Sequence, residues 1–187
     1  NDDPFDFAFT GRRSIENVGL AGEYRFDGER FDFSAAIRHD INDRFADETT
    51  FRMGAGIDAS EDTRLRANYG TGIKNPGFFE LFGFFDGRFI GNEDLSPEKS
   101  ESWEVGVDQR LAEGAMTLSA TFFDSRLEDE IFTTFPAPLY IATPANRGTL
   151  SKQRGVELSA RAQLGKQLTL DAAYTYLDAQ ENGVEEV

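Results

Sequence analysis

Residues 18–37 read VGLAGEYRFDGERFDFSAAI, two runs of alternating apolar and polar residues on either side of a polar turn. The apolar rows hold no charge and comprise Val18, Leu20, Gly22, Tyr24 and Phe26, then Phe31, Phe33, Ala35 and Ile37. Because successive side chains of a β-strand point to opposite faces, alternation with a period of two indicates strands and not a helix. Residues 27–29 (Asp-Gly-Glu) are turn formers. The stretch therefore predicts a β-hairpin with one uncharged face and one polar face.

The same rhythm recurs along the rest of the chain. Further uncharged rows run through residues 51–57, 65–69, 103–107, 116–122, 156–164 and 168–176. Short connections lie at residues 27–29, 59–62, 112–114 and 165–166, and longer segments at residues 40–48, 71–101 and 124–151. The pattern predicts an all-β, antiparallel up-and-down sheet of about eight strands, with short turns at one end and long loops at the other. In the last long segment, residues 127–135 and 139–143 are expected to form a tall hairpin that continues the flanking strands.

The uncharged rows favour a transmembrane β-barrel over a soluble β-sandwich. Strands of globular proteins average about five to six residues, whereas several rows here stay apolar for about nine, close to the 9–11 residues of a strand that spans a bilayer. An Arg or Lys at the lipid-facing midplane costs about 2–4 kcal/mol, which explains rows without charge. Aromatic residues suited to a membrane–water interface gather near the predicted strand ends. They are Phe26 and Phe31 beside a turn, and Tyr69, Trp103, Tyr174 and Tyr176 toward the loops.

Composition excludes several classes of function. The 187 residues carry a formal net charge of −15 and include no cysteine. A nucleic-acid partner is not expected because phosphate binding needs clustered Lys and Arg, and a disulfide scaffold or thiolate metal site is excluded. His39 is the only histidine, which excludes a multi-histidine metal site. We expect His39 to lie at a membrane interface or toward a loop.

Two groups of oxygen-bearing side chains do not fit a catalytic or metal site. Residues 128–130 (Glu-Asp-Glu) are adjacent on a predicted strand, so their side chains alternate between faces and cannot converge. The set Asp86, Asn92, Glu93 and Asp94 does not have the spacing of a calcium loop. No nucleophile–base set is present either. The sequence predicts neither an enzyme nor a bound cofactor or metal.

Residues 71–107 read TGIKNPGFFELFGFFDGRFIGNEDLSPEKSESWEVGV, a glycine-rich loop with proline punctuation that leads into a strand near Ser102. The loop contains an unusual set of phenylalanines: Phe78, Phe79, Phe82, Phe84, Phe85 and Phe89. So many apolar rings on a solvent-exposed loop need a ligand, a partner or a covering surface.

In this segment and in those that follow it, the chain resembles the TonB-dependent outer-membrane receptors. Order and spacing match over about residues 49–179, in the runs 74–76 (KNP), 80–81 (EL), 91–98 (GNEDLSPE), 102–107 (SWEVGV), 121–123 (TFF), 127–131 (LEDEI), 154–158 (RGVEL) and 174–179 (YTYLDA). The residues that carry the family motifs, with a structural role expected for each, are Asn75, Pro76, Glu80, Leu81, Asn92, Leu95, Pro97, Glu98, Trp103, Glu104, Gly106, Gly155 and Glu157.

The resemblance implies a 22-stranded barrel in the lipid of the Gram-negative outer membrane, filled by an N-terminal plug domain. Such a receptor imports a siderophore–iron complex, cobalamin or a similar large nutrient. Its energy comes from the inner-membrane protein TonB, which contacts the plug through a peptide called the TonB box. The long loops would be extracellular and the short turns periplasmic. Ligand proximity is expected at Phe84, Phe85, Arg88 and Phe89, and some polar-row arginines are expected to bond the plug.

Residues 1–187 are then expected to be one partial barrel domain, about a third of the full strand count. The chain opens without a signal peptide, and we expect it to lack the plug, the TonB box and the closing strands. Alone, such a piece should not transport, and it should self-associate through its strand edges or bury its apolar face. A passive porin-like barrel and a soluble β-sandwich binding module are the alternatives.

Overall fold

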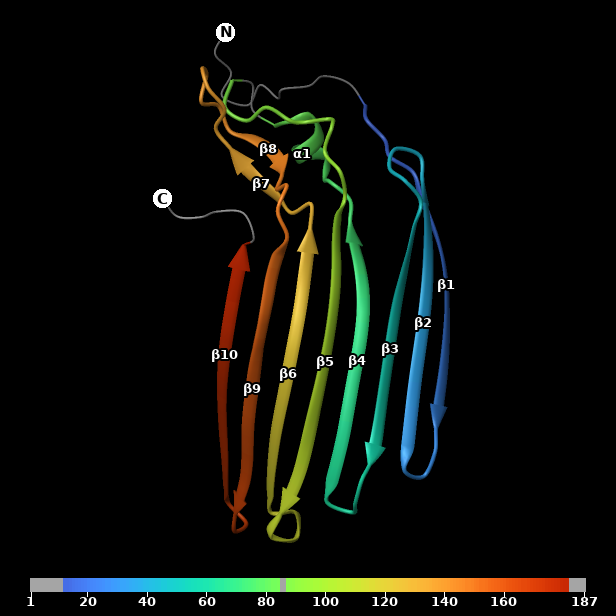
Figure 1. The fold of residues 1–187 in the computed structure, drawn as a ribbon, viewed down its shortest axis with the longest axis vertical. Helices are drawn as coiled ribbons and strands as arrows, with labels where there is room; N and C mark the ends of the chain where they lie inside the picture. The colour runs from blue at the N-terminus through green and yellow to red at the C-terminus, as the bar shows by residue number, and fades with distance from the viewer. Residues whose placement is uncertain (1–11, 85–86, 182–187) are drawn as a thin grey trace.

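A computed structural model describes residues 12–84 and 87–181 and contains one large antiparallel sheet (Figure 1). Its eight strands follow the order β1-β2-β3-β4-β5-β6-β9-β10, so each long strand pairs with the next long strand along the chain. Their bounds are β1 (Asn17–Asp27), β2 (Phe31–Asn42), β3 (Glu48–Asp58), β4 (Thr63–Lys74), β5 (Glu98–Leu111), β6 (Met116–Glu128), β9 (Ser151–Leu164) and β10 (Leu168–Glu181). The predicted all-β, up-and-down, partial-barrel architecture is confirmed.

The predicted short turns are also confirmed, and they gather at one end of the sheet, which we call the turn end (Figure 1). The opposite, loop end differs from the prediction because the strands continue further. β4 reaches Lys74 and β5 begins at Glu98, and β6 and β9 likewise extend into the segment 124–151. These extensions pair in register, as Lys74 opposite Glu98 shows. The apolar row ends before the strand does, so the alternation could not show that the last residue pairs near the loop end belong to the strands.

Three small elements cover the loop end: α1 (Phe78–Phe82), β7 (Ile131–Thr134) and β8 (Thr143–Asn146). β7 and β8 form their own two-stranded sheet. The predicted tall hairpin is therefore present, but its boundaries are wrong: the returning strand is β8 and not residues 139–143, and the pair is separate from the large sheet. Asp129, between β6 and β7, has a φ of 54°, a left-handed conformation that interrupts the strand at that point.

The large sheet is a single layer whose apolar rows stay exposed. Leu20, Tyr174 and Phe122 keep 79%, 61% and 36% of their area accessible. We call the side that carries them the apolar face and the other side the polar face. A β-sandwich would bury these rows between two layers, so that alternative is wrong for this chain. Within the described residues, no helix is both long and apolar enough to cross a membrane.

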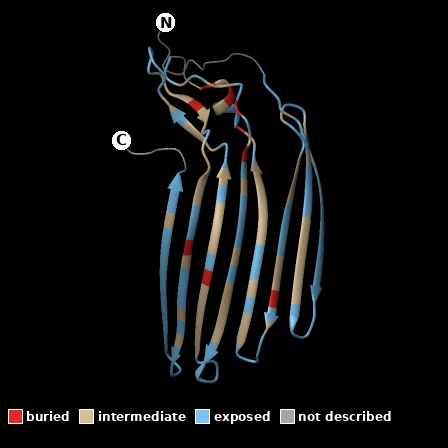
Figure 2. Ribbon diagram, viewed as in Figure 1, coloured by how far each residue is buried: buried red, intermediate tan, exposed pale blue. Residues whose placement is uncertain are grey.

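Burial is concentrated at the loop end, as Figure 2 shows. Six of the buried described residues lie there: Pro76, Leu81, Gly83, Leu95, Glu98 and Pro144. Apart from Glu98, the first residue of β5, the long strands contribute only Gly56, Thr121 and Gly155 in the part of the chain that the structure describes. The strands form a wall, and the packed core sits on top of it.

The aromatic residues and His39 lie toward the ends of the strands, as predicted. The Phe26 and Phe31 rings lie 6.3 Å apart across the β1–β2 turn. Tyr69 and Trp103 are opposite each other in the β4–β5 register, toward the loop end. His39 lies near the loop end of β2, where its Nδ1 is 2.8 Å from Thr49 Oγ1.

The sheet is not closed. β1 and β10 are its two edge strands, and among the described residues no strand pairs with their outer sides. Such edges offer unpaired backbone groups to another strand. Self-association of the isolated segment through them stays a prediction.

Candidate functional site: the loop cap and the polar face

The loop end is covered by a compact unit, which we call the loop cap: the described parts of residues 75–97 and 129–150, including α1, β7 and β8. Its centre consists of Leu81 and Leu95, with 1% and 4% of their area exposed, together with Pro144, which is also fully buried. These residues come from two loops more than 45 positions apart in the sequence. The cap is therefore a tertiary structure of its own and not a pair of independent loops.

Local chemistry sets both ends of α1. The Gly77 N–H donates to Glu80 Oε2 at 2.6 Å, a capping-box contact that satisfies an unpaired helix N-terminal group. Leu81 N–H donates to the Gly77 carbonyl at 3.0 Å. The helix ends at Gly83, whose φ of 73° and ψ of 175° suit only glycine. In the family-motif pair, Glu80 therefore caps the helix, and Leu81 is part of the buried centre of the loop cap.

Two asparagines join the two loops. Asn92 donates from its backbone to the Glu80 carbonyl at 2.8 Å and from Nδ2 to the Pro144 carbonyl at 3.0 Å. Asn146 accepts from Ser96 N–H at 2.7 Å and donates to the Ser96 carbonyl at 2.9 Å. Asn92 belongs to the predicted motif set, whereas sequence reasoning missed Asn146. A lone asparagine in a loop carries no distinguishing signal.

Glu98 anchors the cap to the wall. It is 9% exposed at the first position of β5. Its Oε1 accepts from Ile131 N–H at 2.8 Å, and its Oε2 pairs with Lys74 Nζ at 3.1 Å. A buried carboxylate needs such partners. The charge of Glu98 thereby connects β4, β5 and β7 at one point.

The aromatic residues of the cap form a chain of ring contacts. Phe79 meets Phe84 edge-on at 5.5 Å, and Phe84 stacks on Phe89 at 4.7 Å. Phe89 also bridges to Ala142, next to β8. Of the four ligand candidates, the structure brings Phe84 and Phe89 together and leaves Arg88 exposed nearby in the sequence.

Two residues named in the sequence analysis lie outside the described residues. They are Phe85, the remaining ligand candidate, and Asp86, a member of the rejected calcium set. Among the described residues, no group of three or more His, Cys, Asp or Glu side chains is placed to hold a metal ion.

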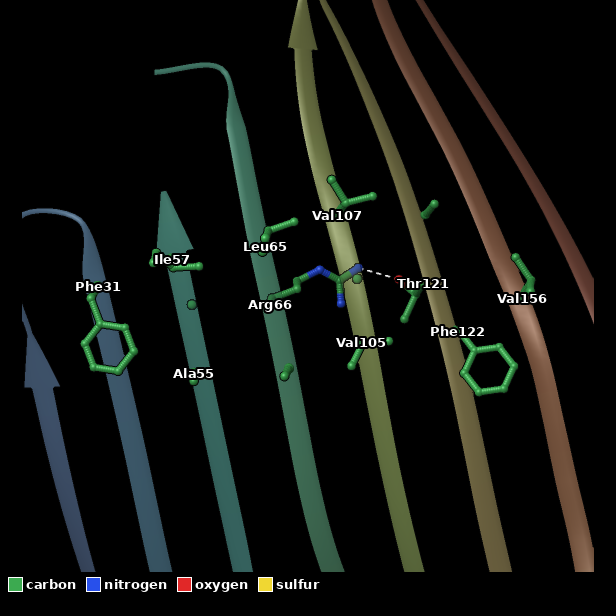
Figure 3. Close-up of a pocket in the computed structure, with 14 residues that line it drawn as sticks. Phe31, Ala55, Ile57, Leu65, Arg66, Val105, Val107, Thr121, Phe122 and Val156 are labelled. Atoms are coloured by element: carbon green, nitrogen blue, oxygen red, sulfur yellow. Dashed lines mark hydrogen bonds between the residues drawn. The ribbon is translucent and has the colours of Figure 1, made fainter. Parts of the chain in front are cut away.

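The polar face is covered by cross-strand ion pairs centred on Arg66. Its Nη1 lies 3.6 Å from Glu104 Oε1, its Nε lies 3.4 Å from Asp108 Oδ2, and its Nη2 donates to Thr121 Oγ1. Figure 3 shows the Arg66 side chain crossing β5 toward Thr121 on β6. One arginine of β4 therefore ties three neighbouring strands.

Glycines make this flat arrangement possible. The Arg66 guanidinium lies directly over Gly106, so that a Cβ there would be 2.8 Å from Arg66 Cζ. On β9, the Phe123 ring lies over Gly155 in the same way. The motif residues Gly106 and Gly155 thus leave the space that long neighbouring side chains fill.

On the polar face, Arg52 and Glu157 are charged residues that have no ion pair to any other described residue. Both line a groove of about 710 Å³ that is floored by small residues such as Gly70 and Ser102. Glu104, by contrast, accepts from Asn68 Nδ2 at 2.7 Å. The polar face is therefore mostly self-paired, with one free cation and one free anion at the groove, among the residues described.

The geometry can be compared with known proteins. The family model described as "TonB dependent receptor-like, beta-barrel" matches residues 1–186. The chain belongs to this family. TonB-dependent receptor barrels reside in the outer membrane of Gram-negative bacteria, and the family comprises transporters and not enzymes.

Solved structures of receptors and transporters share the fold. The siderophore receptor PirA from Pseudomonas aeruginosa is 19% identical with a TM-score of 0.77, covering 88% of this chain and 32% of that one. A ferric enterobactin receptor (PfeA) mutant from Pseudomonas aeruginosa is 16% identical, with a TM-score of 0.74 and coverages of 87% and 26%. The copper transporter OprC is 20% identical, with a TM-score of 0.69 and coverages of 87% and 29%. The chain thus spans about a third or less of these receptors.

Proposed function

We propose that this segment is part of the barrel wall and extracellular loops of a receptor that imports a siderophore–iron complex, cobalamin or a similar large nutrient. The observation that carries the proposal is the combination of an uncharged apolar face with a packed loop cap at only one end. The siderophore and ferric enterobactin receptors among the solved structures support a chelated-metal ligand. In the complete receptor, a plug domain and the inner-membrane protein TonB supply the energy coupling.

The uncharged band of the apolar face is about as long as a strand that spans a bilayer. On β4–β5 a polar pair marks each limit of the uncharged band. Thr63 Oγ1 donates to Gln109 Oε1 at 2.7 Å near the turn end, and Tyr69 Oη donates to Glu101 Oε1 at 3.2 Å near the loop end. The paired rows that contain Gln109 and Glu101 are eight residues apart, or about 26 Å at about 3.3 Å per residue. This length runs along the strand, and a tilted strand needs about 9–11 residues to span a bilayer.

A charge placed on the apolar face should be far more damaging than the same charge on the polar face. Ala172 and Ala173 are neighbours near the middle of β10 and point to opposite faces. In the full-length receptor we expect Ala172→Arg to destabilise the folded barrel by about 2–4 kcal/mol. Urea unfolding in lipid vesicles, followed by tryptophan fluorescence, measures this change.

Ala173→Arg is the matched control, because it adds the same side chain one residue away on the polar face. We expect a cost of under about 1 kcal/mol for it, because substitutions at polar surface positions usually change stability by about 0.5 kcal/mol or less. Equal costs for the two variants would contradict the placement of the apolar face in lipid.

The plug domain is the proposed partner of the polar face. Arg52 and Glu157 line the same groove, and neither has an ion pair to another described residue. A wall whose other charges are mostly paired leaves these two for complementary groups on the plug. We therefore propose that Arg52, one of the polar-row arginines, bonds the plug in the complete receptor, and that Glu157 does the same.

The ligand is proposed to approach the aromatic part of the loop cap at Phe84, Phe85, Arg88 and Phe89. Phe79, at the exposed end of the ring chain, is 62% accessible. Aromatic faces and a guanidinium together suit a flat or anionic chelate. The chain of rings gives such a ligand a preformed apolar surface.

Changes at this surface should weaken ligand binding without affecting the barrel. In the full-length receptor we expect the double variant Arg88→Gln/Phe89→Ser to bind its ligand at least about tenfold more weakly, a loss of about 1.4 kcal/mol. The assay measures binding of ferric enterobactin and of cobalamin to cells that express the receptor. Phe135→Ser is the control, since Phe135 is similarly exposed, at 61%, on the β7–β8 connection. Unchanged binding of the ligand that the wild type takes would remove these residues from the site.

A further inference from the structure

The apolar face is not smooth. A groove of about 640 Å³ crosses β3–β6, with Ala55, Ala67 and Val105 in its floor and the larger Phe31 and Phe122 at its margins (Figure 3). A second groove of about 420 Å³ lies beside it toward β10. Both grooves have Val107 and Ala120 in their lining, so they are neighbours on the same face, and we call the two together the depression. Their volumes fall in the range of about 300–1,000 Å³ of ligand sites.

Strand register creates this depression. Ala55 lies opposite Ala67, and Ala67 lies opposite Val105, so three small side chains stand side by side across β3, β4 and β5. On the next pair of strands, Val107 lies opposite Ala120. The floor is therefore a row of short aliphatic side chains. Arg66 and Thr121 also line the first groove, but they belong to the polar rows, so the floor suits a flexible hydrocarbon chain.

A polar pair closes the turn end of the depression. Gln109 lines the second groove, and its Oε1 accepts the hydrogen bond from Thr63 Oγ1. Its Nε2 donates one hydrogen to the Arg110 carbonyl at 2.9 Å and carries a second hydrogen. An apolar channel with an amide donor at one end, at the limit of the uncharged band, matches an amphiphile with an ester or headgroup oxygen.

We infer that this depression is a binding site for one phospholipid of the leaflet nearer the turn end. Its acyl chain lies over Ala67 and Ala120, and its ester region lies at Gln109. The inference rests on the proposed function, because it requires the apolar face to lie in a membrane. It goes beyond that function, since a specific retained lipid differs from the bulk lipid that surrounds any barrel.

Filling the floor should displace the lipid while leaving the barrel folded. The full-length receptor and its Ala67→Phe/Ala120→Phe variant are reconstituted in nanodiscs of phosphatidylethanolamine and phosphatidylglycerol, transferred to mild detergent and counted for bound phospholipid by native mass spectrometry. We expect about fivefold less retained phospholipid in the variant, equivalent to about 1 kcal/mol. Ala162→Phe, on the same face of β9 outside both grooves, should retain as much as the wild type.

Two results would overturn the inference. One is equal phospholipid retention by all three proteins. The other is a receptor dimer that the groove-filling variant loses and Ala162→Phe keeps, since a second copy would then occupy the depression. Failure of the proposed function is separately visible: it would appear as equal tolerance of Ala172→Arg and Ala173→Arg, whatever the lipid count.

Discussion

Replacing Gly155 by valine is expected to prevent assembly of the wall. A Cβ at this position would lie 2.8 Å from Phe123 Cζ and 3.0 Å from Phe123 Cε1, and it would also collide with the Tyr176 carbonyl oxygen of β10. A backbone atom inside a ladder cannot move aside as a side-chain tip can. We expect a loss of about 3 kcal/mol or more, at or above the upper end of ordinary overpacking. The measurement is the amount of heat-modifiable, folded receptor in outer-membrane fractions.

Gly22→Val is the control for this change. Gly22 also lies within a strand, and no atom stands within 4 Å of the position that its Cβ would take. The amount of folded receptor should match the wild type for Gly22→Val and fall several-fold for Gly155→Val. A normal yield of Gly155→Val would mean that β6 and β10 approach Gly155 less closely than described.

Replacing Gly91 by valine is expected to unfold the loop cap while the strands remain paired. A Cβ on Gly91 would lie 2.5 Å from both Leu81 O and Phe82 C and would also collide with Gly83 N. All three are backbone atoms at the end of α1, so this contact cannot relax by a rotamer change. We expect proteolysis within the cap to become at least about tenfold faster, which corresponds to a loss of about 1.4 kcal/mol or more of local stability. Ligand binding to the full-length receptor should fall with it.

Gly148 is also a glycine of the loop cap and serves as the control position. Gly148→Val meets no atom within 4 Å of the added Cβ, so the cap should keep its protease resistance. Heat-modifiable mobility should stay normal in both variants, because neither position lies in a long strand. Loss of the folded barrel in Gly91→Val would show that the wall depends on the cap.

The sequence predicted the wall well because a single physical rule governs it. Successive side chains of β1 and β2 point to opposite faces, of which one is apolar, so the apolar residues of the stretch 18–37 recur at every second position. Beyond the apolar band, both faces are polar, and the rule loses its signal. Lys74 and Glu98 pair there, and no alternation indicates that their strands continue.

The loop cap could not be predicted in the same way. Its core joins Leu81 and Leu95 to Pro144, and its hydrogen bonds join Asn92 and Asn146 to the facing loop, across about 50 positions of sequence. No local pattern encodes a contact at that distance. The family resemblance identified Asn92 and Leu81 as motif residues, and only the three-dimensional arrangement explains why they are needed. The space under Arg66 likewise became visible only once the register placed Gly106 beside it.

The location of the buried core has an evolutionary consequence. Because the most buried residues of the cap, Leu81, Leu95 and Pro144, lie above the wall, we expect mutations at the cap surface to accumulate without disturbing the strands. Mutations in the strands, in turn, face selection set by the bilayer and by register. The sequences of the loop cap and of the strands can therefore diverge at different rates. Glu98, which connects the two parts, is expected to stay constrained by both.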